Sequence, residues 1–220
     1  MFFIKRHRTA RSVPLSATVD YYFSSISPFT YLGHETLCTV IDRQNANLRF
    51  RPVDLGAINS APDDRAMQPT ELKRRYCLVD LRRVAEMRDV PINLKPAHFP
   101  SDPDLADHIV IALTMLDIDP RDFMLRAFQA LWTDDKDIAD EAQMKAILAD
   151  LKLPAEEILK LAKTGEATRK RVDYSRKASS LGIEGVPTYV LNGELFFGQD
   201  RIEYLESALM SGRAPYTFER

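Results

Sequence analysis

One serine stands where a hydroxyl group could stabilise an anion. Ser27 and Pro28 follow the apolar segment Thr18–Phe23 and precede a stretch with helical spacing of apolar residues. A hydroxyl at the N-terminus of a helix feels the helix dipole and lies near free backbone N–H groups, so it can donate a hydrogen bond to an anion such as a thiolate. The alternative interpretation is that Ser27 only caps the helix.

Two further motifs, in the last third of the chain, carry groups that could bind a ligand. The run GVPT at 185–188 places Pro187 at the start of a predicted strand, which indicates either a special turn or an ordinary edge-strand proline. The run GQDR at 198–201 opens the final predicted helix, so Gln199, Asp200 and the helix N-terminus would bind the head group of an amino acid. Asp200 and Glu203 also have the spacing of a capping box, and the two roles are compatible.

The elements that must position these residues follow from the apolar pattern. Strands are predicted at 18–23 and 48–53, joined by a helix over 31–43, which makes a βαβ unit with a parallel pair. Near the other end, the Asn192-Gly193 dipeptide predicts a tight hairpin between strands at 187–191 and 195–197. The remaining predicted helices cover 69–89, 105–116, 121–131, 140–151, 154–163, 166–181 and a last segment that ends near 212.

Strands at both ends of the chain with helices between them favour one sheet that is interrupted by a helical insertion. We therefore expect an α/β chain with a thioredoxin-like fold and a DsbA-type helical insertion. The thioredoxin-like part would comprise 18–56 and 166–212, and the inserted subdomain 57–165. The first 17 residues carry four basic side chains and no acidic one, which predicts a flexible tail; an address or an anion-binding arm is the alternative.

Composition excludes several classes of function. The chain has 220 residues with 30 basic and 32 acidic side chains, so a net charge of −2 favours neither nucleic acid nor a membrane surface as a partner. No apolar run is long enough to span a membrane. Cys38 and Cys77 form neither a CxxC motif nor a metal-ligand spacing, which indicates no metal, no disulfide and a reducing, cytoplasmic location. Both lie in apolar-periodic segments and are predicted to be buried and redox-inert.

Four segments together resemble a known family. They are VDYYFSSISPFTYLG from position 19, K-x-x-Y-x-x-x-D-L at 73–81, HFPSD from position 98, and GVPTYVLNGELFFGQDR from position 185. In this order they resemble the 2-hydroxychromene-2-carboxylate isomerases and the related kappa-class glutathione transferases, over about residues 18 to 210. The resemblance implies glutathione as cofactor and a homodimer.

The resemblance also assigns roles to single residues. Ser27 matches the catalytic serine that donates a hydrogen bond to the glutathione sulfur. Lys73 matches a lysine that pairs with the glycine carboxylate of glutathione. Val186 matches the residue before a cis-proline, here Pro187, and its backbone would pair with the cysteinyl part. Gln199 and Asp200 match the pair that holds the γ-glutamyl end.

Three positions depart from the family pattern. Asp64 lies where many relatives have an asparagine near glutathione, Glu184 lies where an aromatic residue is usual, and Val84 replaces a frequent tryptophan. The two carboxylates would repel an anionic tripeptide. The departures therefore bear on glutathione affinity and on which electrophile binds.

The leading hypothesis is a glutathione-dependent isomerase of 2-hydroxychromene-2-carboxylate type, which would act on breakdown products of aromatic compounds. A kappa-type transferase is the second hypothesis. A disulfide oxidoreductase is disfavoured because no cysteine lies near Ser27, and a non-catalytic peptide-binding protein would use the groove beside Pro187. The candidates for lining the substrate pocket are Phe29, His98, Phe99 and Trp132. His98 has the side chain that could act as an acid or base near pH 7.

Overall fold

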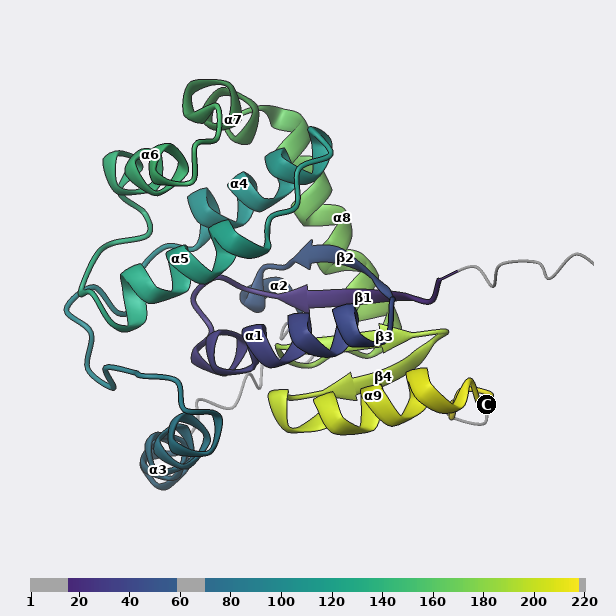
Figure 1. The fold of residues 1–220 in the computed structure, drawn as a ribbon. Helices are drawn as coiled ribbons and strands as arrows, with labels where there is room; N and C mark the ends of the chain where they lie inside the picture. The colour runs from purple at the N-terminus through teal and green to yellow at the C-terminus, as the bar shows by residue number, and fades with distance from the viewer. Residues whose placement is uncertain (1–15, 59–69, 218–220) are drawn as a thin grey trace, which may run out of the picture.

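The computed structural model describes residues 16–58 and 70–217. Asp64 and nearly all of the predicted basic tail lie outside these ranges. Figure 1 shows the described residues as a mixed sheet with helices on both faces and a helical block beyond one edge of the sheet. Within those ranges, no helix has both the length and the apolar character needed to cross a membrane.

Both ends of the chain contribute strands to one four-stranded sheet. Strand β1 (Thr18–Phe23) pairs in parallel with β2 (Asn47–Pro52), and helix α1 (Pro28–Arg43) connects them. Strand β3 (Thr188–Leu191) pairs antiparallel with β1, and β4 (Glu194–Phe197) pairs antiparallel with β3. The strand order is β2-β1-β3-β4. This order confirms the prediction of a thioredoxin-like sheet assembled from two distant segments.

The hairpin between β3 and β4 has the predicted turn. Asn192 and Gly193 both have positive φ angles, 52° and 87°, which is the backbone conformation of a type I′ turn. Asparagine and glycine tolerate this region best, so the dipeptide sets the register in which Val190 faces Leu195.

Alternation along the strands divides the apolar side chains between the two faces of the sheet. One set packs under α1 and the final helix α9 (Ile202–Ser211), and its buried strand members are Val19, Tyr21, Phe23, Phe50, Tyr189, Leu191 and Phe196. Tyr22 and Val190 point the other way and pack with Ala178 of helix α8 (Gly165–Leu181). The period-two pattern therefore covers both faces of the sheet with helices.

The helical block between β2 and α8 contains six helices of the described part of the chain. They are α2 (Leu55–Ile58), α3 (Glu71–Arg88), α4 (Asp104–Met115), α5 (Arg121–Trp132), α6 (Glu141–Asp150) and α7 (Ala155–Ala162). Helix α4 contacts β2, α7 and α8, whereas α5 packs on α1. Figure 1 shows α4 to α7 stacked beyond β2, with α3 standing apart from them on the other side of α1. All were predicted within a few residues except α2, which is too short for a periodic signal.

Candidate functional site

Ser27 lies at the N-terminus of α1, directly after β1. Its Oγ accepts a hydrogen bond from the backbone N–H of Thr30 at 3.2 Å, and its own N–H donates to the carbonyl of Ser24 at 3.0 Å. The side chain therefore caps the helix, as one of the two interpretations expected. Because the cap uses a lone pair of the oxygen, the hydroxyl proton stays available for donation to a ligand.

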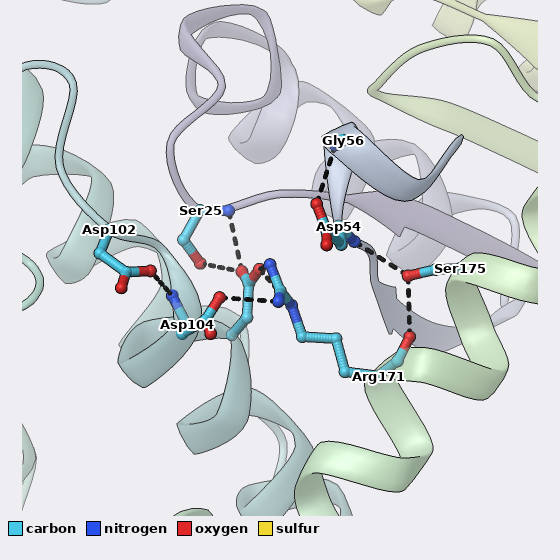
Figure 2. A network of polar contacts seen from close by, with 8 residues as sticks. Ser25, Asp54, Gly56, Asp102, Asp104, Arg171 and Ser175 are labelled. Carbon is cyan, nitrogen blue, oxygen red and sulfur yellow. Dashed lines mark hydrogen bonds and ion pairs between the residues drawn. The ribbon is translucent and has the colours of Figure 1, made fainter. Parts of the chain in front are cut away.

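The turn that carries Ser27 is anchored by a buried carboxylate. Ser25 donates from its backbone N–H and from its Oγ to Oδ1 of Asp107, at 2.9 and 2.7 Å. Oδ2 of Asp107 accepts from Nε of Arg171 at 3.1 Å, and Nη1 of Arg171 binds Asp104 at 2.7 Å. Figure 2 shows Ser25 approaching this network from the turn and Arg171 from α8. Helices α4 and α8 thus hold the turn in place.

Burial dominates the electrostatics of Asp107. Desolvation raises the pKa of its carboxyl to about 6, although Arg171 and the hydrogen bonds from Ser25 act in the opposite direction. Nothing in the sequence indicated this residue, because an aspartate in the first turn of a helix is ordinarily explained by the helix dipole. Its partner Arg171 lies 64 positions away.

A groove of about 510 Å³ lies between α3 and the segment that ends the sheet. Five of the predicted site residues line it: Phe29, Val186, Pro187, Gln199 and Asp200. Ser27 is not part of the lining, but it stands two positions before Phe29 at the start of the same helix. The structure therefore brings three separate sequence motifs to one place.

In the groove, the motif around Pro187 contacts the motif that begins at Gly198. The Val186–Pro187 peptide bond is cis, as the resemblance implied. The N–H of Gly198 donates to the carbonyl of Pro187 at 2.8 Å, which ties the start of the final helical segment to the cis-proline. Gly198 has a φ of 102°, a region that side chains rarely adopt, so glycine is required at this link.

Gln199 and Asp200 begin a short 3₁₀ helix, η1 (Gln199–Arg201), which leads into α9. Gln199 is 4 % exposed, whereas Asp200 is exposed and pairs with Arg201 at 3.3 Å. The expected capping box is absent, because neither η1 nor α9 has a side-chain cap. Glu203 instead pairs with Arg88 of α3 at 3.0 Å.

Helix α3 supplies the opposite wall of the groove. Asp80, Arg83, Val84 and Met87 line it. Of these, Asp80 belongs to the motif at 73–81 and Val84 is a departure from the family pattern, whereas no sequence signal indicated Arg83 or Met87. Lys73 is exposed and does not line the groove, but it precedes Asp80 by two helical turns and shares its face. Glu184 is exposed and also lies outside the groove.

The other predicted pocket residues lie elsewhere. His98 and Phe99 are exposed on the connection between α3 and α4, and the ring of Phe99 packs 5.0 Å from that of Trp132, measured between ring centroids. Trp132 is 2 % exposed and belongs to the core at the end of α5. None of these three residues is among those that line the groove beside Phe29.

Both cysteines are free and lack thiolate character. Burial raises the pKa of Cys38 to about 12. Burial and the nearby charge of Asp80 also raise the pKa of Cys77. A thiol with a raised pKa is a poor nucleophile at neutral pH, so neither residue is suited to thiol–disulfide exchange.

A second depression of about 490 Å³ lies at the opposite end of α1, and its charges neutralise one another. Arg121 pairs with Asp42 and Asp119 at 2.7 and 2.6 Å, and Arg51 pairs with Asp20 at 3.1 Å. Because Arg51 and Arg121 are already paired with carboxylates, this depression is less suited to a charged ligand than the groove beside α3.

Comparison with known proteins places this geometry in context. The model of the DSBA-like thioredoxin domain family matches residues 18–210. The chain is 26 % identical over 202 residues to the 2-hydroxychromene-2-carboxylate isomerase of Sphingobium xenophagum, covering 89 % of this chain and 100 % of the relative. It is also 26 % identical over 216 residues to glutathione S-transferase kappa 1 of Homo sapiens, covering 89 % of this chain and 92 % of the relative.

A solved structure has the same fold. The chain superposes with a TM-score of 0.72 on a 2-hydroxychromene-2-carboxylate isomerase at 24 % identity, covering 88 % of this chain and 95 % of the other. Sheet order, helical insertion and cis-proline are thus found together with a family match that spans most of the sequence. The chain belongs to the family of DSBA-like thioredoxin domains.

Proposed function

We propose that the protein is a glutathione-dependent isomerase of 2-hydroxychromene-2-carboxylate type, acting on aromatic breakdown products. The observation that carries this proposal is the groove in which Phe29, Val186, Pro187, Gln199 and Asp200 meet beside the N-terminus of α1. The similarity to isomerases over nearly the whole chain supports the reaction class. The name of the kappa-class relative supports glutathione as the cofactor.

The groups present fit a γ-glutamyl peptide. The carboxylate of Asp200 is an acceptor for an ammonium group, and Gln199 lies beside it as a buried amide. Ser27 has a hydroxyl proton that its capping bond does not use, and it stands at the positive end of α1. The Ser27 donor at the start of α1 is therefore separate from Gln199 and Asp200, which line the groove.

Each residue has a separate task in this proposal. Ser27 donates to the sulfur and holds it as a thiolate, while the backbone of Val186 binds the cysteinyl part. Asp200 and Gln199 hold the γ-glutamyl end, and Lys73 attracts the glycine carboxylate. Asp64, outside the described residues, is the further candidate for contact with glutathione. When bound, glutathione supplies a thiolate that adds reversibly to a carbon–carbon double bond, which rotates while it is single.

Kappa-type transferase activity is the second candidate, favoured by the human relative. The same groups would activate the thiol, and only the fate of the adduct differs. A disulfide oxidoreductase is disfavoured by the raised pKa of Cys38. A non-catalytic peptide-binding protein would use the cis-proline but would have no need of a γ-glutamyl linkage.

Calorimetric titration distinguishes a glutathione-dependent enzyme from a peptide-binding protein, and a turnover assay distinguishes the isomerase from the transferase. We expect the protein to bind glutathione more tightly than the linear isomer whose glutamate is linked through its α-carboxylate. Incubation of the complex with 2-hydroxychromene-2-carboxylate should then give the isomerised product without net consumption of glutathione, whereas a transferase would consume it. Equal affinity for both peptides, or no binding, would contradict the proposal.

A homodimer in the cytoplasm is part of the proposal. Helix α3 exposes three apolar residues with helical spacing, Leu72 at 77 %, Tyr76 at 60 % and Val79 at 42 %, which suits contact with a second copy. Two free cysteines suit a reducing compartment. Sedimentation velocity at micromolar concentration should give a dimer, and Tyr76→Glu should shift it to the monomer. A monomeric wild type would contradict this part.

A further inference from the structure

The last residue of α3 reaches across to the start of the final helix. The guanidinium of Arg88 donates from Nε to Oε1 of Gln199 at 3.1 Å and from Nη2 to the backbone carbonyl of Gln199 at 2.9 Å. Its third nitrogen, Nη1, pairs with Glu203 at 3.0 Å. The side chain of Arg88 is only 9 % exposed and Gln199 is buried, so the contacts between these two residues are shielded from water, whereas Glu203 is exposed. Arg88 thus holds both the main chain and the side chain of Gln199.

This contact decides which end of the Gln199 amide faces the groove. A guanidinium has only donors, so the amide oxygen must face Arg88 and the amide nitrogen must point away from it. Among the described residues, Nε2 of Gln199 has no acceptor, and Gln199 lines the groove. The ligand therefore meets a hydrogen-bond donor at this position, never an acceptor.

Packing removes the remaining freedom of Gln199. Its Cβ lies so close to α1 that a Cβ built on Gly33 would stand 2.7 Å from it. Its carbonyl is held by Arg88, and the preceding Gly198 is held by Pro187. Rotation of the side chain or a flip of its amide would break the contact with Arg88, and the flipped NH₂ would oppose the guanidinium donors.

We propose that Arg88 is a positioning residue that keeps the Gln199 amide oriented as a donor, so that this end of the groove selects a ligand with a free carboxylate. The inference rests on the proposed function, in which that carboxylate belongs to the γ-glutamyl group. Asp200 next to it is the acceptor for the ammonium of the same group. Gln199 and Asp200 would thus bind the carboxylate and the ammonium group of one amino acid, the first as a hydrogen-bond donor and the second as an acceptor.

A purely structural role for Arg88 makes a different prediction. If Arg88 only fastened α3 to α9, its removal would loosen the whole wall of the groove. Binding of every part of the ligand would then weaken alike. If Arg88 orients Gln199, only ligands that carry the γ-glutamyl group should be affected.

The experiment compares three peptides on matched variants. Dissociation constants for glutathione, γ-glutamylcysteine and cysteinylglycine are measured by protein NMR titration, which reaches millimolar values. The variants are wild type, Arg88→Met, Arg88→Lys and Arg82→Met; the last removes the same charge from an exposed position of the same helix, outside the groove. A further variant, Gln199→Glu, retains an oxygen for Arg88 but presents an acceptor in place of Nε2.

For Arg88→Met we expect affinity for glutathione and γ-glutamylcysteine to fall about tenfold or more, the loss expected for a misplaced hydrogen bond to a charged group. Cysteinylglycine should bind as before. Arg88→Lys, which keeps one donor, should recover part of the loss, and Arg82→Met should match wild type. Gln199→Glu should lose the preference for γ-glutamyl peptides without a lower melting temperature.

Each other outcome overturns a stated part of the argument. Equal weakening of all three peptides by Arg88→Met would make Arg88 merely structural. An unchanged preference in Arg88→Met or Gln199→Glu would remove the positioning role while glutathione binding by wild type stands. A wild type without preference for γ-glutamyl peptides would overturn the proposed function and this inference together.

Discussion

Both hydrogen-bond donors of Ser25, its backbone N–H and its hydroxyl, converge on one oxygen of Asp107, 82 positions further along the chain. Asp107 is completely buried, and its second oxygen is bound by Arg171. The turn that carries Ser27 is therefore held by a charged group from the helical insertion. An insertion of this kind does more than cover the sheet, because it fixes the main chain next to the catalytic candidate.

The pH dependence of the free energy of unfolding should reveal the raised pKa of Asp107. Its pKa is raised to about 6 by burial, so between pH 4 and pH 6 the folded state binds a proton that the unfolded state has released. The free energy of unfolding must therefore fall as pH rises through this range. Relative to Asp107→Asn, which lacks this titration, wild type should lose about 2 kcal/mol between pH 4 and pH 7.

The comparison with Asp107→Asn is needed because His34 acts in the opposite direction. Burial lowers the pKa of His34 to about 4, so its contribution to stability rises with pH between about pH 4 and its unfolded pKa near 6.5. The two effects largely cancel in the wild-type curve alone. Urea titrations of both proteins from pH 4 to pH 7 isolate Asp107, and a constant difference between them would contradict its raised pKa.

Gly33→Ala should displace Gln199, which lines the groove and packs against α1. The added methyl group would stand 2.7 Å from Cβ of Gln199 and 3.3 Å from Cδ1 of Ile202, in a fully packed contact between α1 and the final helix. Overpacking of this kind costs about 1–3 kcal/mol. We expect a lower free energy of unfolding in urea together with weaker glutathione binding, because Gln199 must move.

Gly165→Ala is the matched control for that substitution. Gly165 is exposed in the first turn of α8, and the nearest group to an added Cβ is the flexible end of Arg169 at 3.3 Å. Alanine is the better helix former, so this variant should be unchanged or slightly more stable. An unchanged free energy of unfolding in Gly33→Ala, as expected for Gly165→Ala, would contradict the close contact between α1 and Gln199.

Local signals in the sequence were sufficient for most of the fold. The Asn192-Gly193 turn, the helix start at Pro28 and the β-branched and aromatic residues of β1 are each local in the sequence, so each element could be predicted. Helix α2 (Leu55–Ile58) could not, because four residues contain no full period. The cis bond before Pro187 followed from the family resemblance rather than from the residues themselves.

Long-range pairing limited the prediction of the site. Glu203 has capping-box spacing from Asp200, yet it binds Arg88, which approaches from another part of the chain. Arg88 and Gln199 are 111 positions apart, and no local pattern distinguishes this arginine from the others of α3. Residue type alone made Trp132 a pocket candidate. It is 2 % exposed and packs in the core, so its role toward a substrate stays a prediction.

The cysteines should be inert in redox assays. Burial raises the pKa of both Cys38 and Cys77, so almost no thiolate is present at pH 7. We expect no catalysis of insulin reduction and slow reaction of Cys38 with a thiol reagent in the native state. The Cys38→Ala, Cys77→Ala double variant should match wild type in glutathione-dependent isomerisation. Insulin reduction that disappears in the double variant would contradict this.

Removal of the Ser27 hydroxyl tests the centre of the proposed chemistry. A hydrogen bond to a charged group contributes roughly 1.5–3 kcal/mol, so Ser27→Ala should raise the thiol pKa of bound glutathione by about one to two units. Turnover at neutral pH should fall about ten- to a hundredfold. Affinity for glutathione should change much less, because Asp200, Lys73 and the backbone of Val186 hold the rest of the tripeptide. The thiolate absorbance of bound glutathione is followed against pH.

Stability alone cannot decide the role of Ser27, because its Oγ caps α1 through Thr30 and its loss should cost about 1 kcal/mol in any case. Thr164→Ala provides the matched control, since Thr164 caps α8 in the same way through Ala167, away from the groove. Both variants should melt at lower temperature than wild type, but only Ser27→Ala should change the thiol pKa. If the two variants share an unchanged thiol pKa, Ser27 is a helix cap and another group must stabilise the thiolate.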